Sequence, residues 1–117
     1  MDIEDTLLGL AALAQGTRLE VFRLLVQAEP LGIAAGELAR RLAVPQNTMS
    51  AHLAVLFRAG LLVSERHSRS IIYRANLLRL RELVLFLLKD CCSGRAEICA
   101  PLIADLASCC PVKEVCS

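Results

Sequence analysis

Six cysteines lie close together near the end of the chain. All of them fall within the last 27 residues, as Cys91, Cys92, Cys99, Cys109, Cys110 and Cys116. The sequence begins with acidic residues rather than a basic secretion signal, so we expect a cytoplasmic protein. Cytoplasmic cysteines are more often metal ligands or redox groups than structural disulfides. Their thiolates select soft, thiophilic centres.

Three of these cysteines, Cys91, Cys92 and Cys99, are the best candidates for a ligand set. Adjacent cysteines on a regular helix diverge by about 100°, but at a fraying helix end beside Ser93 and Gly94 they can converge. The six residues between Cys92 and Cys99 close a loop at small entropic cost. Arg95 lies nearby and could help to hold a thiolate.

Other interpretations of the cysteines remain open. They could form a redox pair, or they could be reduced surface thiols without a role. Zinc on four thiols is also possible, whereas His52 and His67 are too distant in sequence to favour a mixed site. Cys109, Cys110 and Cys116 could form a second site, exchange with the first, or do nothing.

The middle of the chain is strongly basic. Residues 40–81 hold one acidic residue, Glu65, and eight arginines, which together give +7: Arg40, Arg41, Arg58, Arg66, Arg69, Arg74, Arg79 and Arg81. Residues 1–39 sum to −4 and residues 82–117 to −2. This pattern indicates either a localised polyanion-binding face or a solvated, arginine-rich surface.

The elements that must position these residues are mostly helical. Apolar residues make up 56% of the chain but aromatic residues only 3%, which favours packed helices. Apolar spacing predicts helices over 3–14, 17–28, 37–42 and 45–57, with a capping box from Thr17 to Glu20 at the second start. Strands over 62–66 and 70–74 form a hairpin with its tip at 67–69. Asn76 caps a last long helix to about Asp90, and residues 101–107 form a short one.

This order of elements is that of a winged helix-turn-helix, mainly α with a small β-hairpin. In the 45–57 helix, Met49, Leu53 and Leu56 form an apolar stripe that faces the domain. Small polar side chains lie off that stripe and suit base edges in the major groove of DNA, namely Gln46, Asn47, Thr48 and Ser50. In the hairpin, Arg66 and Arg69 are placed to reach phosphates. Tyr73 either contacts DNA or packs the hairpin.

Several stretches resemble the ArsR/SmtB metalloregulators. They are Thr17–Leu25, Leu38-Ala39, Thr48–Leu56 with its Ser-x-His-Leu-x-x-Leu core, Ala59–Leu62, Arg66 and Tyr73-Arg74. The resemblance covers roughly residues 7–90. It implies a homodimer built from the first and last helices, and repression at double-stranded operator DNA that an inducer relieves. It also places Ser50 toward the groove. His52 has no partner ligand, and a single histidine of this kind is more often near phosphate or packed at a turn than a metal ligand, so we count His52 among the DNA-binding residues.

The cysteines depart from the family's best-known pattern, a Cys-x-Cys pair inside the helix-turn-helix. Cys91, Cys92 and Cys99 instead resemble the C-terminal three-thiol site of variant arsenic sensors. As(III) takes three sulfurs in a pyramid, so we expect As(III) or Sb(III) as inducer and no cofactor for folding. A redox-switched or Zn-, Cd- or Hg-responsive repressor is the alternative. We expect domains at 1–92 and 93–117.

The sequence disfavours two other classes of protein, a membrane-spanning protein and a thiol enzyme. The sequence has no apolar run of the length that spans a membrane. A thiol enzyme would need an oxyanion loop or a Cys-x-x-Cys motif on a βαβ unit, and the sequence has neither. The last helix is apolar on nearly all sides, which predicts that a partner subunit covers it.

Overall fold

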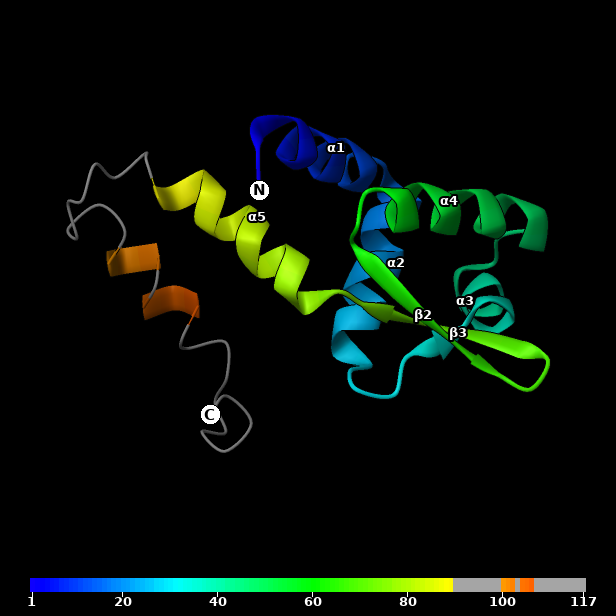
Figure 1. Ribbon diagram of the computed structural model, residues 1–117. Helices are drawn as coiled ribbons and strands as arrows, with labels where there is room; N and C mark the ends of the chain where they lie inside the picture. Colours follow the sequence, from blue (N-terminus) through cyan, green and yellow to red (C-terminus); the bar gives the residue numbers. More distant parts are fainter. Residues whose placement is uncertain (90–99, 103, 107–117) are drawn as a thin grey trace. The chain divides into compact units, whose positions relative to one another are not determined.

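The computed structural model describes residues 1–89, 100–102 and 104–106. The chain divides into two compact units, residues 1–83 and 84–117; the boundary expected at 92/93 stays a prediction. Eight elements follow one another (Figure 1): α1 (Ile3–Leu13), α2 (Gly16–Gln27), β1 (Ile33–Ala34), α3 (Ala35–Leu42), α4 (Gln46–Arg58), β2 (Leu62–His67), β3 (Ser70–Ala75) and α5 (Leu77–Lys89). Residues 100–102 and 104–106 are helical, within the predicted 101–107 helix apart from residue 100.

Polar side chains cap α1, α2 and α5 at their N-termini, whereas α3 and α4 have no side-chain cap. The Asp2 carboxylate accepts a hydrogen bond from the Asp5 N–H at 2.8 Å, where α1 begins. At α2 the capping residue is Gln15, which accepts from the Arg18 N–H at 2.9 Å. The predicted capping box at Thr17 is therefore wrong, because the helix already begins at Gly16. Asn76 accepts from the Arg79 N–H at 3.2 Å, as predicted for α5.

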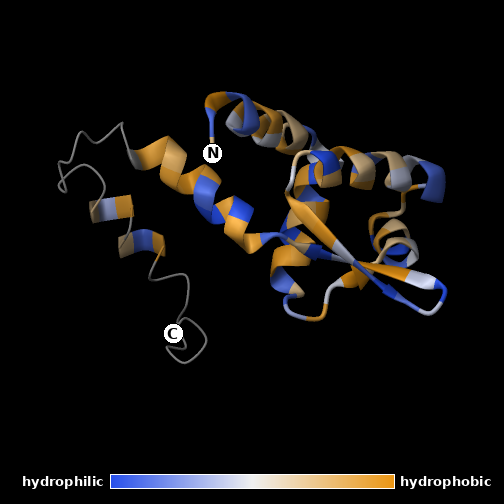
Figure 2. Ribbon diagram, viewed as in Figure 1, coloured by the Kyte–Doolittle hydropathy of each residue, from blue (hydrophilic) through white to orange (hydrophobic). Residues whose placement is uncertain are grey.

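A core of aliphatic side chains joins α2, α3, α4 and the base of the hairpin. Its fully buried members are Val21, Leu25, Leu38, Met49, Leu53, Leu56 and Leu61. The predicted stripe of α4 is thus confirmed, since its three residues are at most 1% exposed. Figure 2 shows apolar residues running along these core helices. Gly60 (φ 82°) ends α4 in the left-handed region, where glycine is favoured.

The hairpin belongs to a three-stranded antiparallel sheet with the order β1-β3-β2. Leu62 pairs with Ala75 and His67 with Ser70, so β2 extends one residue beyond its predicted end and the turn is Ser68-Arg69. β1 was not predicted. It has only two residues, and Ile33 pairs with Tyr73. This short strand ties the base of the hairpin to the segment that enters α3.

α1 buries its small residues and exposes its large ones. Thr6, Gly9 and Ala12 face inward, and a Cβ added at Gly9 would lie 3.8 Å from the Leu83 side chain. The large apolar residues that gave the helical spacing are exposed, among them Ile3 at 60% and Leu7 at 58%. Within the first unit, this outer face of α1 is therefore an uncovered apolar surface.

No helix in the described ranges has both the length and the apolar character needed to cross a membrane.

Candidate nucleic-acid interface

A tight turn joins α3 to α4. Ala43 adopts the left-handed region (φ 54°), and the Val44 N–H donates back to the Ala39 carbonyl at 3.0 Å. Pro45 then precedes the first residue of α4, where a missing N–H costs little. α3 packs on α4, and both contribute to the core, so the outer face of α4 is held in a fixed direction.

The outer face of α4 is polar and exposed. Gln46, Asn47, Thr48 and Ser50 are all exposed, whereas His52 is half-buried. The Asn47 side-chain oxygen accepts from the Thr48 N–H at 2.9 Å, which leaves its NH₂ group as the available donor. α4 thus combines a buried apolar stripe with exposed amide and hydroxyl groups, the arrangement required for reading base edges.

A groove lies between α4, the start of α3 and the hairpin. Its volume is about 330 Å³, and its lining includes Ser50 of α4, Arg69 of the turn, and Ile71 and Tyr73 of β3. Ser50 and Arg69, which are distant in sequence, therefore line one cavity. Tyr73 is half-buried and lines the same groove. The structure thus brings Arg69, one of the two predicted hairpin cations, to the predicted reading helix.

Ion pairs within the fold neutralise part of the basic middle of the chain. Glu37 pairs with Arg40 and Arg41, and Arg79 lies 3.9 Å from Asp5. Arg74 binds Glu29 and Glu65.

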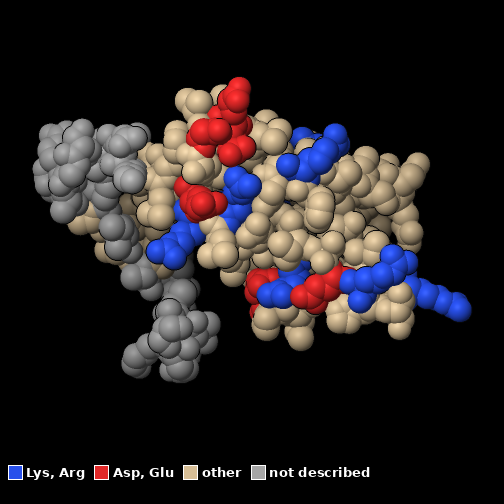
Figure 3. Space-filling view, in the orientation of Figure 1, with Lys and Arg blue, Asp and Glu red and all other residues tan. Residues whose placement is uncertain are grey.

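Within the described part of the chain, the exposed Arg66 and Arg69 have no such partner. Figure 3 shows basic side chains projecting at the tip of the hairpin. The cations available for a polyanion are therefore fewer than the sequence suggests, and those of the hairpin are among them.

Glu37, in the first turn of α3, is an acid-sensitive contact. Hydrogen bonds from Arg40 and then Arg41, whose Nε lies 2.8 Å away, lower the Glu37 pKa from 4.5 to about 2. A carboxylate whose pKa is lowered by folding adds stability above pH 4.5, and this is lost as the pH falls toward about 2. We expect Glu37→Gln to flatten the decline of unfolding free energy across this range, measured by urea denaturation. Equal slopes for variant and wild type would contradict the assignment.

Arg18 was not singled out from the sequence, yet it joins three helices. Its Nε donates to the Ala12 carbonyl of α1 at 2.7 Å, and its Nη1 lies 3.5 Å from Nδ1 of His52 in α4. Because arginine only donates, Nδ1 of His52 acts as the acceptor in this contact. The role of His52 in DNA binding stays a prediction.

The six cysteines lie outside the described residues, so the predicted ligand set Cys91, Cys92 and Cys99 stays a prediction. Among the residues that are described, no group of three or more histidine, cysteine, aspartate or glutamate side chains could hold a metal ion.

Comparisons with known proteins agree with this geometry. A family model described as a helix-turn-helix domain matches residues 13–65. An ArsR-like transcriptional regulator from Rhodococcus sp. RHA1 is 28% identical, with 93% of this chain and 92% of that chain covered and a TM-score of 0.65. No curated protein sequence matches the chain significantly.

Two further solved structures are similar. One is a homodimeric winged helix-turn-helix DNA-binding domain from Mycobacterium bovis, a possible ArsR-family regulator, at 25% identity, 78% and 82% coverage of the two chains, and TM-score 0.62. The other is a possible transcriptional regulator for arsenical resistance, at 27% identity, 83% and 94% coverage, and TM-score 0.59. The fold is therefore a winged helix-turn-helix with ArsR-family structural neighbours, and the similarities point to a DNA-binding transcription regulator, not an enzyme.

Proposed function

We propose that this chain, a winged helix-turn-helix protein in the fold of ArsR-family regulators, is a dimeric transcriptional repressor that releases operator DNA when As(III) or Sb(III) binds its cysteines. The observation that carries the DNA-binding part is the outer face of α4. Exposed amide and hydroxyl groups lie there, opposite the buried Met49, Leu53 and Leu56. Arg69 of the hairpin lines the same groove.

Each structural feature supports one role in this repressor. Gln46, Asn47, Thr48 and Ser50 would contact base edges, while Arg66 and Arg69 of the hairpin, hereafter the wing, would contact phosphates. The outer face of α1 needs a cover, which a second copy of the chain would supply; the structural neighbour from Mycobacterium bovis is homodimeric. A symmetric dimer would then set the two α4 helices into successive major grooves.

The inducer part of the proposal is supported by the chemistry of the donor set. Three thiolates suit As(III) or Sb(III), and one structural neighbour is a possible regulator for arsenical resistance. Cys91 follows the last residue of α5 by two positions, so binding there would act on DNA indirectly. Linkage then requires that the inducer and DNA weaken each other equally, by about 1–3 kcal/mol in an ordinary allosteric protein.

The proposal is tested by titrating arsenite, antimonite, Zn²⁺, Cd²⁺ and Hg²⁺ into protein bound to a duplex that the protein itself has selected from a randomised library. The titrations are run under reducing conditions. Release by arsenite or antimonite supports the proposal. Release only by divalent metals would contradict the proposal and indicate a metal-responsive repressor. Release only after addition of an oxidant would indicate a redox-switched repressor.

The wing arginines give a prediction about DNA affinity. We expect Arg66→Ala and Arg69→Ala each to weaken binding to selected and random duplexes alike, and to reduce the salt dependence of log K by about 0.9 per lost phosphate contact. Gln46→Ala and Ser50→Ala should instead cost more on the selected duplex. Fluorescence anisotropy at graded salt concentrations measures both effects. Arg23→Ala, at an exposed position of α2, is the control, and an equal slope change in that variant would count against the wing contacts.

A further inference from the structure

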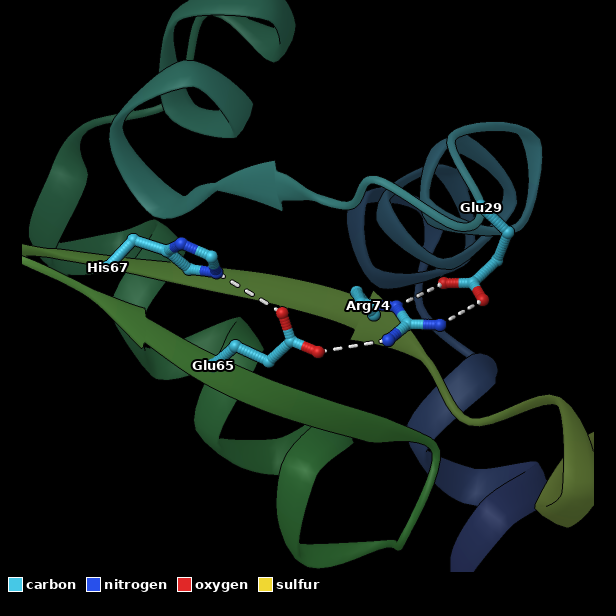
Figure 4. A network of polar contacts seen from close by, with 4 residues as sticks. All are labelled: Glu29, Glu65, His67 and Arg74. Atoms are coloured by element: carbon cyan, nitrogen blue, oxygen red, sulfur yellow. Dashed lines mark hydrogen bonds and ion pairs between the residues drawn. The ribbon is translucent and has the colours of Figure 1, made fainter.

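Arg74 occupies the centre of a polar network at the base of the wing. Its Nε and one Nη bind the two carboxylate oxygens of Glu29 at 3.1 and 3.0 Å. Its other Nη binds Glu65 of β2 at 3.0 Å. Glu65 also lies 3.2 Å from His67. Figure 4 shows these four residues, which we call the wing-root network, with the guanidinium between the two carboxylates.

The network connects the wing to the body of the domain, by which we mean α2 and the segment that follows it. Glu29 follows the C-terminal end of α2 and its side chain is only 16% exposed, while that of Arg74 is 29% exposed. The two carboxylates raise the pKa of Arg74, Glu29 by the larger effect. Hydrogen bonds from His67 and Arg74 lower the pKa of Glu65. Each of the three guanidinium nitrogens thus donates to a carboxylate oxygen of the protein.

The wing has two faces with different partners. Side chains alternate along a strand, so Glu65 and His67 lie on one face of β2 and Arg66 on the other. Arg66 pairs with Ile71 across the strands, and Ile71 lines the groove beside α4. The face of Arg74 and Glu65 is therefore opposite to the one that faces the groove. An arginine on that face is poorly placed to contact DNA that is bound to α4 and to the groove side of the wing.

Gly32 allows the body to approach the wing closely. It has φ +76°, and a Cβ at this position would lie 2.6 Å from both Cγ of Arg74 and the Tyr73 carbonyl oxygen. Only a glycine fits this approach without displacing β3. An isolated two-stranded hairpin is marginally stable and free to tilt, whereas this one is attached at its root by β1, Gly32 and the Glu29–Arg74 pair.

We infer that Arg74 is a positioning residue rather than a DNA contact, and that its bidentate bond to Glu29 sets the direction in which the wing presents Arg66 and Arg69 to the phosphate backbone. This inference rests on the proposed DNA-binding function. It assigns to Glu29, an acid outside the basic segment, a role in DNA binding.

The direction in which Glu29→Gln changes the affinity for DNA distinguishes a positioning role of Arg74 from a phosphate contact. Removal of an acidic charge ordinarily strengthens DNA binding, because the protein becomes more positive. If Glu29 holds the wing through Arg74, Glu29→Gln weakens binding to the selected duplex instead, by about tenfold, as for the loss of a charge-assisted hydrogen bond. Glu20→Gln removes the same charge from an exposed position of α2 and should bind at least as tightly as wild type.

A second variant tests Arg74 itself. Arg74→Lys keeps the positive charge but loses the planar fork that binds two carboxylate oxygens. We expect it to weaken binding as Glu29→Gln does, with the salt slope of wild type, because no phosphate contact is lost. Binding and slope like those of wild type in Arg74→Lys, or tighter binding in Glu29→Gln, would overturn the inference. Thermal unfolding identifies a variant that fails to fold, in which case the other variant decides.

Amide hydrogen exchange tests the network without DNA. We expect the β3 amides of residues 72–75 to exchange faster in Glu29→Gln than in wild type or Glu20→Gln, since the strand loses its attachment to the body. Unchanged protection would overturn the inference even if the wild-type protein bound no duplex. Absence of any DNA binding by wild type would by contrast overturn the proposed function, so the two failures are distinguishable.

Discussion

A variant with Cys91, Cys92 and Cys99 all changed to serine is expected to remain on its DNA at arsenite concentrations that release the wild-type protein. Serine keeps the size of the side chain but removes the soft thiolate that As(III) requires. For wild type, arsenite should lower the affinity for the selected duplex by about 5- to 150-fold, the range of ordinary allosteric coupling. In the variant this factor should fall to one, while the affinity without arsenite stays the same.

The distal cysteines supply the matched control. A variant with Cys109, Cys110 and Cys116 changed to serine removes the same number of thiols and should still release DNA with arsenite. Anisotropy titrations under reducing conditions measure both variants, and arsenic bound per subunit, measured by mass spectrometry, should be one in wild type and in the control. If the first variant releases DNA at the arsenite concentration of wild type, the distal thiols become the favoured site.

Much of the first unit could be predicted because its signals are local. The spacing of Met49, Leu53 and Leu56 indicates both a helix and its buried face. Gly60 marks the end of that helix, and Asn76 the beginning of the next. β1 could not be found in this way, because two residues are too few to display a period. The start of α2 was misplaced because two possible capping residues, Gln15 and Thr17, lie two positions apart.

The electrostatics of the interface could not be predicted from charge counts. Arg74 and Glu29 are 45 residues apart in the chain, and only the fold brings them together. A count over residues 40–81 therefore overestimates the cations available to DNA. Arg66 and Arg69, which are among the side chains that remain available, are distinguished from Arg74 by the face of the wing on which they lie and by the position of Glu29, which are tertiary properties.

α1 illustrates the same limit for packing. Its apolar spacing correctly predicted a helix, yet that spacing does not say which face turns inward. In the first unit the inner face consists of Thr6, Gly9 and Ala12, whose small size lets the helix pack closely. The larger Ile3 and Leu7 remain exposed. A stripe that would normally be assigned to the core of the subunit is therefore a surface in need of a partner.

The last prediction follows from this exposed stripe. Leu7→Glu should weaken dimerisation by about a hundredfold or more, because an unpaired charge in an apolar interface costs several kcal/mol. The fold of the subunit should be unaffected, since the Leu7 side chain is 58% exposed. Analytical ultracentrifugation over a concentration series measures the change in dissociation constant.

Leu31→Glu is the matched control for this experiment. Leu31 is 82% exposed and lies in the turn after α2, away from the α1 stripe, so this variant carries the same new charge and should remain dimeric. Because two linked subunits hold two half-sites with a high effective concentration, Leu7→Glu should also weaken binding to a duplex with two half-sites far more than to a single half-site. A Leu7→Glu protein that sediments as the dimer would move the interface away from α1.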